Sequence, residues 1–312
     1  MGPGMVAASA ARHSGRTKLL ILEPTHADAR ATMKTLHDKL VVITGAASGI
    51  GRALALACAR RGARLLLADI DAEGLAEVAT QARALGATCH SRHTDTGSED
   101  AVFALAAYCA AELGAADVVV NNAGVGLVSS VEKLRTADAT WLMNINFWGV
   151  VHGCRAFLPQ LRTRPQALLV NISSIFAMVS MPTQSIYNAA KAAVRGFSDA
   201  LREELRETQV GVLCVHPGGI QTNIVNKARM ADLSLAEMSE QQMRANFDQN
   251  ARTTPEQAAQ AIVQAMLGGK TRLLIGTDAK ILDLVYRLVP ARSSAWLSAL
   301  ARRRRDAFKA AA

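Results

Sequence analysis

The sequence lacks the features that mark membrane-spanning and secreted proteins. No apolar run reaches the roughly 18 residues that a membrane-spanning helix needs. The first residues do not form an apolar segment of the kind that directs secretion. We therefore expect a protein of the cytoplasm.

Paired cysteines are also missing. The five cysteines are odd in number, scattered along the chain and never arranged as CxxC. This pattern argues against a disulfide framework and against a cysteine-ligated metal. We expect no metal site and read the cysteines as buried free thiols.

Acidic residues are fewer than basic ones, which gives a net charge of +9. The excess lies at the two ends of the chain, because residues 270–312 alone contain ten Lys/Arg and three Asp/Glu. A nucleic-acid-binding domain should instead carry its basic charge on a folded face. The sequence therefore predicts a nearly neutral folded body that does not bind nucleic acid.

Short runs rich in Val, Leu and Ile alternate with longer stretches of helical spacing. Continuous apolar runs of this kind are typical of strands buried on both faces. Their alternation with helices predicts an α/β fold, a Rossmann-like doubly wound parallel sheet of about seven strands with helices on both faces. The predicted strands end at Gly45, Ile70, Asp95, Gly124, Ser174, Gly219 and Gly276.

A glycine cluster, "TGAASGIG" at 44–51, falls between the first predicted strand and the first predicted helix. Gly45, Gly49 and Gly51 would let the backbone approach a pyrophosphate closely, and the helix start at Ser48 would point free N–H groups at it. Asp69 ends the second strand, where a carboxylate accepts hydrogen bonds from ribose hydroxyls and repels a 2′-phosphate. This favours NAD over NADP, although NADP stays possible and Asp69 could instead cap a helix.

Tyrosine is scarce, with three in the chain, and one of them lies four residues before a lysine in "SIYNAAK". On a helix, Tyr187 and Lys191 would share one face. The ammonium would favour the phenolate and so tune Tyr187 as an acid or base. The small neighbours Asn188, Ala189 and Ala190 would leave room for ligands against this helix.

These motifs together resemble the short-chain dehydrogenase/reductase family, over about residues 38–278. The resemblance rests on "TGAASGIG", "NNAG" at 121–124, "NINFWG" at 144–149, "NISS" followed by "YNAAK", and "HPGGIQT" at 216–222. It implies catalytic roles for Asn146, Ser174, Tyr187 and Lys191, with Ser173 close enough to be confused with Ser174. It implies cofactor contacts from Gly45, Ser48, Gly49, Ile50, Gly51, Asp69, Asp95, Asn122, Ala123, Gly124, Tyr187, Lys191, Pro217, Gly218, Ile220 and Thr222.

By this resemblance the protein should interconvert a secondary alcohol and a ketone with NAD(P), Tyr187 acting as general acid/base. Ser174 would bind the reacting oxygen, and Asn146 would hold a water that connects Lys191 to solvent. The apolar residues of segment 222–254 predict a lid over a hydrophobic substrate, and Phe176 would narrow the pocket. A dinucleotide-binding sensor without catalysis is the alternative from another class.

The two ends lie outside the resemblance. We expect residues 1–37 to be a disordered extension and residues 279–312 to be a basic amphipathic helical tail, broken at Pro290. The tail could be solvated, or it could dock on an anionic membrane and serve a lipid or steroid-like substrate. The family commonly forms homo-dimers or homo-tetramers through the helices that would hold Asn146 and Tyr187.

Overall fold

The computed structural model describes residues 33–235, 239–295, 298–299 and 302–303. The predicted extension falls mostly outside this part of the chain, since residues 1–32 are not described. Met33 and Leu36, which the sequence assigned to the extension, are buried in the core. The folded body therefore includes residues from Met33 onward.

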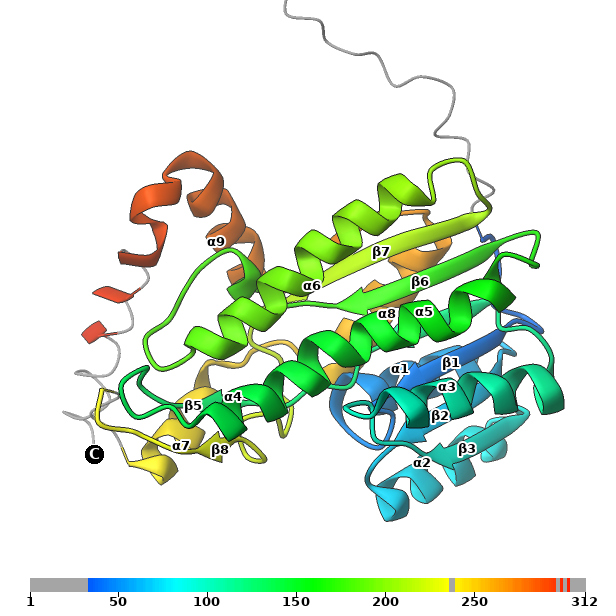
Figure 1. Cartoon of the computed structure of the whole chain (residues 1–312), viewed down its shortest axis with the longest axis horizontal. Coiled ribbons are helices and arrows are strands. Elements are labelled where there is room, and N and C mark those ends of the chain that lie inside the picture. The colour runs from blue at the N-terminus through cyan, green and yellow to red at the C-terminus, as the bar shows by residue number, and fades with distance from the viewer. Residues whose placement is uncertain (1–32, 236–238, 296–297, 300–301, 304–312) are drawn as a thin grey trace, which may run out of the picture. The chain divides into compact units, whose positions relative to one another are not determined.

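Seven parallel strands form the central sheet, in the order β3-β2-β1-β4-β6-β7-β9 (Figure 1). All seven predicted strands are present, which confirms the α/β fold class. The order reverses between β1 and β4, so the two βαβ halves wind outward from this point. The strands are β1 (Leu40–Thr44), β2 (Arg64–Asp69), β3 (Cys89–His93), β4 (Val118–Asn121), β6 (Ala167–Ile172), β7 (Val210–Pro217) and β9 (Arg272–Ile275).

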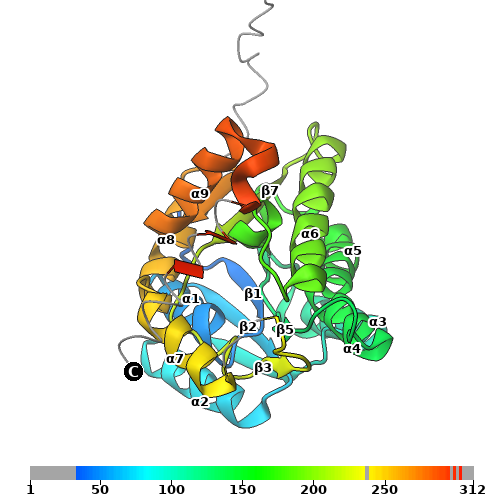
Figure 2. The same ribbon diagram turned by 90° about the vertical axis from the view of Figure 1, so that its left-hand side faces the viewer.

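Helices cover both faces of the sheet, as Figure 2 shows in an end-on view. Successive side chains of a strand point to opposite faces, so Val41 and Ile43 enter one apolar cluster while Leu40 and Val42 enter the other. The first cluster packs under α1 (Gly49–Ala59), α2 (Ala72–Ala84) and α8 (Pro255–Leu267). The second packs under α3 (Glu99–Tyr108), α5 (Gly149–Leu161) and α6 (Ser185–Glu204).

Further elements extend the body at the carboxyl ends of the strands. The strand β5 (Leu127–Val128) pairs in parallel with β8 (Arg229–Met230), which lies in the predicted lid. The lid also contains α7 (Glu240–Asn250), and α4 (Thr136–Met143) lies beside β5 and β8 (Figure 1). Because β5 and β8 pair, the lid is tied to the chain that follows β4.

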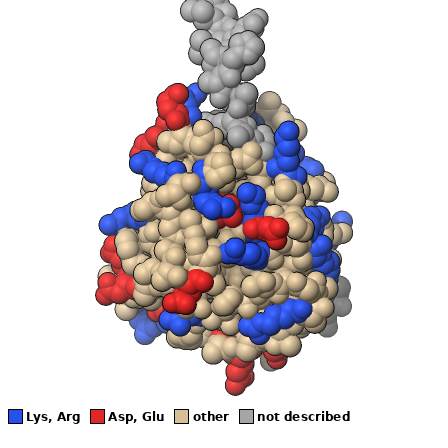
Figure 3. Space-filling view, turned by 90° about the vertical axis from the view of Figure 1, so that its right-hand side faces the viewer, with Lys and Arg blue, Asp and Glu red and all other residues tan. Residues whose placement is uncertain are grey.

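The C-terminal tail begins as α9 (Thr277–Leu288), which ends just before Pro290, and residues 290–295 are again helical. None of the helices within the described residues combines the length and apolarity needed to cross a bilayer. On the side of the molecule opposite the carboxyl ends of the strands, basic and acidic side chains are interspersed (Figure 3). This agrees with the nearly neutral charge of the central sequence.

Candidate active site

The turn between β1 and α1 requires glycine at three positions. Gly45 has φ +65° and Gly49 has φ +53°, both in the left-handed region that favours glycine. A Cβ atom on Gly51 would lie 2.0 Å from the carbonyl oxygen of Gly45. Ser48 precedes α1 and makes no side-chain capping bond. The helix start, with Ile50 in its first turn, therefore keeps its N–H groups free for an anion.

The loop after β4 closes over this turn. Asn122 Nδ2 donates to the carbonyl oxygens of Thr44 and Gly45, at 2.9 and 3.0 Å. The hydroxyl of Thr44 accepts from the backbone N–H groups of Asn122 and Ala123, at 3.1 and 3.2 Å. Thr44 was not among the predicted site residues, because a threonine that ends a strand carries no sign of such a role. These bonds hold the exposed Gly124 at the edge of the site.

Two aspartates predicted to contact the cofactor lie at neighbouring strand ends. Asp69 accepts hydrogen bonds from the backbone N–H groups of Ala47 and Asp71, at 2.9 and 3.0 Å. The helix cap that we considered for Asp69 is made by Asp71, which accepts from Gly74 N at 3.1 Å. Asp95 is exposed and accepts from Gly97 N at 2.8 Å.

The two serines after β6 have different surroundings. Ser173 donates to the backbone carbonyl of Lys191 at 2.8 Å, so it joins the strand to α6. Ser174 begins the 3₁₀ turn Ile175–Ala177, and its hydroxyl lies within hydrogen-bonding reach of the Tyr187 phenol. The Nδ1 atom of buried His216 lies 3.3 Å from the Ser174 carbonyl. Of the two serines, Ser174 is therefore the one that faces the tyrosine.

Tyr187 and Lys191 share one face of α6, as predicted. The Lys191 ammonium lies 5.8 Å from the centroid of the Tyr187 ring and donates to the carbonyl oxygen of Ile172 at 3.0 Å. Lys191 is 3% exposed, and burial lowers its pKa to about 8. Burial also raises the pKa of Tyr187 to about 12, against a smaller lowering by the Ser174 hydrogen bond. Without a bound ligand, burial therefore raises the pKa of Tyr187 by more than any lowering by the Lys191 ammonium, contrary to our expectation.

Asn146 lies in the π-helical turn Asn144–Trp148 between α4 and α5. It is fully buried, accepts from Val125 N at 2.8 Å and donates to the Val125 carbonyl at 2.9 Å. A Cβ atom on Gly124 would lie 3.3 Å from Asn146 Oδ1 and 3.5 Å from Lys191 Nζ. Gly124 thus lies beside both the Asn146 amide and the Lys191 ammonium.

Asn188 has a different position from the one we expected. Instead of leaving room for ligands, its side-chain amide donates to the backbone carbonyls of Phe176 and Val179, at 2.7 and 2.9 Å. These bonds join the turn after Ser174 to α6. The ring of Phe176 packs edge-on against Tyr187, with 6.3 Å between centroids, and so borders the space beside the phenol. Nothing in the local sequence of Asn188 signals this contact.

The loop after β7 completes the site. Pro217 and Ile220 are buried, and Ile220 forms a bridge with Thr253. A Cβ atom on Gly49 would lie 3.1 Å from Cγ2 of Thr222, so this loop reaches the glycine turn. Asp278, which the sequence analysis missed, accepts from Gly219 N at 2.7 Å. A Cβ atom on Gly218 would lie 2.3 Å from the same carboxylate, so Gly218 leaves it room.

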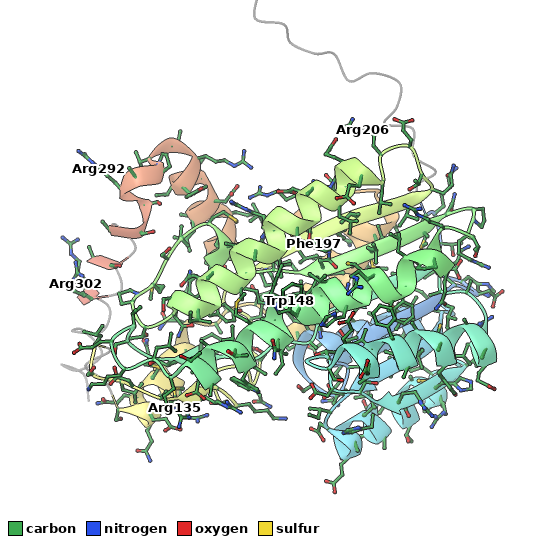
Figure 4. The ribbon with its side chains drawn as sticks, viewed as in Figure 1. Arg135, Trp148, Phe197, Arg206, Arg292 and Arg302 are labelled. Atoms are coloured by element: carbon green, nitrogen blue, oxygen red, sulfur yellow. The ribbon has the colours of Figure 1, made fainter. Side chains whose placement is uncertain are left out.

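A buried carboxylate connects the lid to α4. Asp138 is 1% exposed and pairs with Arg135 at 2.7 Å and with Arg229 at 3.0 Å. Arg229 begins β8, and its guanidinium lies 3.6 Å from the ring centroid of Trp141. Figure 4 shows Arg135 in this part of the molecule, beside the lid. These contacts fix the first part of the lid to the body.

A pocket of about 350 Å³ opens beside the lid. Its walls include Val131, Met181, Pro182 and Leu235, together with Ser185, two residues before Tyr187. The large apolar lid residues that the structure describes are half-buried or exposed, and Leu235 is 59% exposed. Met238 lies outside the described residues. The described part of the chain holds no group of three or more His, Cys, Asp or Glu that could bind a metal ion.

Comparison with known proteins decides the family. The family model for short chain dehydrogenases matches residues 39–233. The chain belongs to the short-chain dehydrogenase family. A Mycobacterium tuberculosis protein named as the oxidoreductase SadH is 42% identical, over 82% of this chain and 93% of its own length. The dehydrogenase/reductase SDR family member 7B of Xenopus tropicalis is 30% identical, over 86% of this chain and 88% of its own length.

Solved structures agree with this assignment. A short chain dehydrogenase/reductase from Burkholderia phymatum in complex with NAD is 29% identical, with a TM-score of 0.73, over 82% of this chain and 96% of that one. Levodione reductase is 26% identical with a TM-score of 0.70, over 78% and 99%. As a short-chain dehydrogenase, the protein is an oxidoreductase, and its candidate site residues gather at the carboxyl ends of the strands.

Proposed function

We propose that this short-chain dehydrogenase interconverts a secondary alcohol and a ketone with a nicotinamide dinucleotide, with Tyr187 as general acid/base. The observation that carries the proposal is the cluster formed by half-buried Tyr187 with buried Ser174 and Lys191. A phenol in hydrogen-bonding reach of a serine, with an ammonium one helical turn away, suits proton exchange with a substrate oxygen.

The residues at the carboxyl ends of the strands fit a dinucleotide. The glycine turn of Gly45, Gly49 and Gly51, followed by the free N–H groups at the start of α1, suits a pyrophosphate. The Asp69 carboxylate suits the ribose hydroxyls and would repel a 2′-phosphate, which favours NAD. The Burkholderia relative with bound NAD supports the same ligand class. When bound, the nicotinamide would supply or accept the hydride.

The pKa values of the cluster suit ketone reduction at neutral pH. With a pKa of about 12, Tyr187 keeps its proton and can donate it to a carbonyl oxygen. Ser174 can hydrogen-bond the same oxygen and stabilise the negative charge that develops there. Lys191, with a pKa of about 8, is mostly protonated at pH 7. In the oxidative direction, positive charge near the phenol must lower the pKa of Tyr187 before it can accept a proton.

The substrate that fits best is apolar. The pocket beside the lid has the apolar side chains of Val131, Met181, Pro182 and Leu235 in its walls, and Phe176 places an aromatic ring against Tyr187. The half-buried and exposed apolar residues of the lid would gain contacts by covering such a substrate.

We also propose that the chain forms a homo-oligomer through α5 and α6. Trp148, just before α5, is 46% exposed, and Figure 4 shows Trp148 and Phe197 near each other where the two helices run side by side. Large aromatic side chains are enriched at protein–protein interfaces.

The first test is a fluorescence titration with NADH and with NADPH, followed by turnover assays on hydrophobic ketones and secondary alcohols. We expect tighter binding of NADH, and loss of this preference in Asp69→Ala. Tyr187→Phe should keep NADH affinity but lose turnover by about 100-fold or more. Tyr108→Phe is the matched control and should keep turnover. Near-normal turnover of Tyr187→Phe would contradict the mechanism, and binding of neither nucleotide would contradict the dinucleotide assignment.

A further inference from the structure

The outer side of α9 and the turn after it exposes a row of large apolar residues. Ile281, Leu284, Leu288 and Val289 are 50%, 57%, 71% and 46% exposed. The first three recur at a spacing of three and four residues, so they form one stripe along the helix. Together they account for four of the ten large apolar residues that are exposed in the described part of the chain.

The opposite side of α9 is fixed to the body, so this stripe cannot simply rotate inward. Ala279, Leu282 and Tyr286 pack into the apolar cluster that includes Ile175 and Met178, directly after Ser174. Buried Asp283 pairs with Arg272 and with Arg287, the latter at 2.9 Å. These contacts set the rotation of α9 and leave the stripe facing outward.

The charges around the stripe are mainly basic, since the exposed acidic residue of α9, Asp278, lies in its first turn and accepts from Gly219 N. From residue 279 to residue 295, Lys280, Arg287 and Arg292 are exposed, and the one acidic residue in this range, Asp283, is buried. On the helix, Lys280 and Arg287 both border the apolar stripe, because they lie four residues before and three residues after Leu284. Figure 4 shows Arg292 and Arg302 at the end of the molecule that carries α9, pointing away from the body.

A basic pocket of about 450 Å³ lies next to α9. Arg195 and Arg272 line it together with Arg287, and so do Asp283 and Asp199. Asp283 pairs with Arg272 and Arg287, and Asp199 pairs with Arg202 at 2.9 Å. Arg195 therefore adds a positive charge for which the described residues supply no acidic partner.

We propose that the α9 surface, formed by Ile281, Leu284, Leu288 and Val289 with Lys280, Arg287 and Arg292, docks on an anionic lipid bilayer. An apolar stripe bordered by basic residues is the pattern of a helix that lies in the membrane interface. The apolar side chains enter the acyl region, and the cations, with Arg195 in the adjoining pocket, attract phosphate headgroups. The inference goes beyond the proposed function and does not depend on catalysis.

Co-sedimentation of the full chain with vesicles tests this inference without nucleotide or substrate. The vesicles are phosphatidylcholine alone, or phosphatidylcholine with about 30% phosphatidylglycerol. We expect binding to the anionic vesicles and little binding to the neutral ones. Leu284→Glu should weaken binding about tenfold or more, because it removes apolar burial and adds repulsion. Arg292→Glu should weaken binding to anionic vesicles and make it less sensitive to salt.

Leu85→Glu is the matched control. Leu85 is 41% exposed at the end of α2, and α2 lies at the opposite end of the molecule from α9 (Figures 1 and 2). This variant should bind vesicles like the wild type. Equal binding of the Leu284→Glu and Leu85→Glu variants would overturn the inference, as would no binding by the wild type. If Leu284→Glu instead lowered the molar mass in light scattering while no chain bound vesicles, the surface would be an interface between copies of this chain.

Discussion

Replacing Lys191 by methionine should change how the stability of the protein depends on pH. Lys191 is buried with its ammonium hydrogen-bonded to the Ile172 carbonyl, and burial lowers its pKa from 10.5 to about 8. One pKa unit corresponds to about 1.4 kcal/mol, so the buried charge costs about 3 kcal/mol of folding free energy at neutral pH. Methionine has a similar length and no charge, so Lys191→Met removes this cost along with the hydrogen bond.

The sign follows from proton binding. Between pH 8 and pH 10.5 the unfolded chain still holds the Lys191 proton, while the folded chain has released it. The free energy of unfolding therefore rises with pH in this window. From pH 7 to pH 9.5 the wild type should gain about 2 kcal/mol relative to Lys191→Met. Burial raises the pKa values of the cysteine thiols, which lowers stability above about pH 9. This contribution is common to both chains for every cysteine but Cys214, whose thiol interacts with the Lys191 ammonium as a minor cause of its pKa.

Urea unfolding of the two nucleotide-free chains at several pH values between 7 and 9.5 measures this difference directly. Lys191→Met should also lose turnover, so a gain or small change in stability at pH 7 would accompany a large loss of activity. A difference between the two chains that stays constant across the pH range would refute the reasoning, because it would show that water solvates the Lys191 ammonium in the folded protein.

Three other predictions use matched or local changes. Gly51→Ala should lower the free energy of unfolding by about 2 kcal/mol, because its Cβ would overlap the Gly45 carbonyl. Gly196→Ala in α6 places its Cβ in open space and should raise the free energy of unfolding by about 0.5–1 kcal/mol. A thermal melt of each variant decides this. Ser174→Ala should lower kcat about 100-fold. Ser173→Ala should lower the free energy of unfolding, because it removes the hydrogen bond to Lys191, and should leave kcat largely intact. Equal kcat values for the two variants would show that the assignment of Ser174 is wrong. Asp138→Asn should weaken the ion pairs with Arg135 and Arg229 and so speed proteolysis within residues 222–235. An unchanged cleavage pattern would show that these ion pairs do not hold the lid.

Most of the fold could be predicted from the sequence, because its signals are local. A strand buried on both faces must be apolar throughout, and this made most of the seven strands visible, although the edge strand β3 is polar and only its first residue is buried. The pairing of β5 with β8 was not visible, since two-residue strands carry almost no pattern. The place where the body begins was also missed, because Met33 and Leu36 become core residues only through their tertiary contacts.

The sequence by itself determined which chemical groups are available: the glycines of the turn, and a tyrosine and a lysine on one helical face. These depend on spacing within a few residues, which helix and turn geometry convert directly into position. Only the tertiary structure decided which serine faces Tyr187, that Asn146 holds Val125, and that Asp278 holds a loop about 60 residues earlier. It also decided the pKa values of Tyr187 and Lys191, because burial, and not the distance between two side chains in the sequence, sets the cost of their charges.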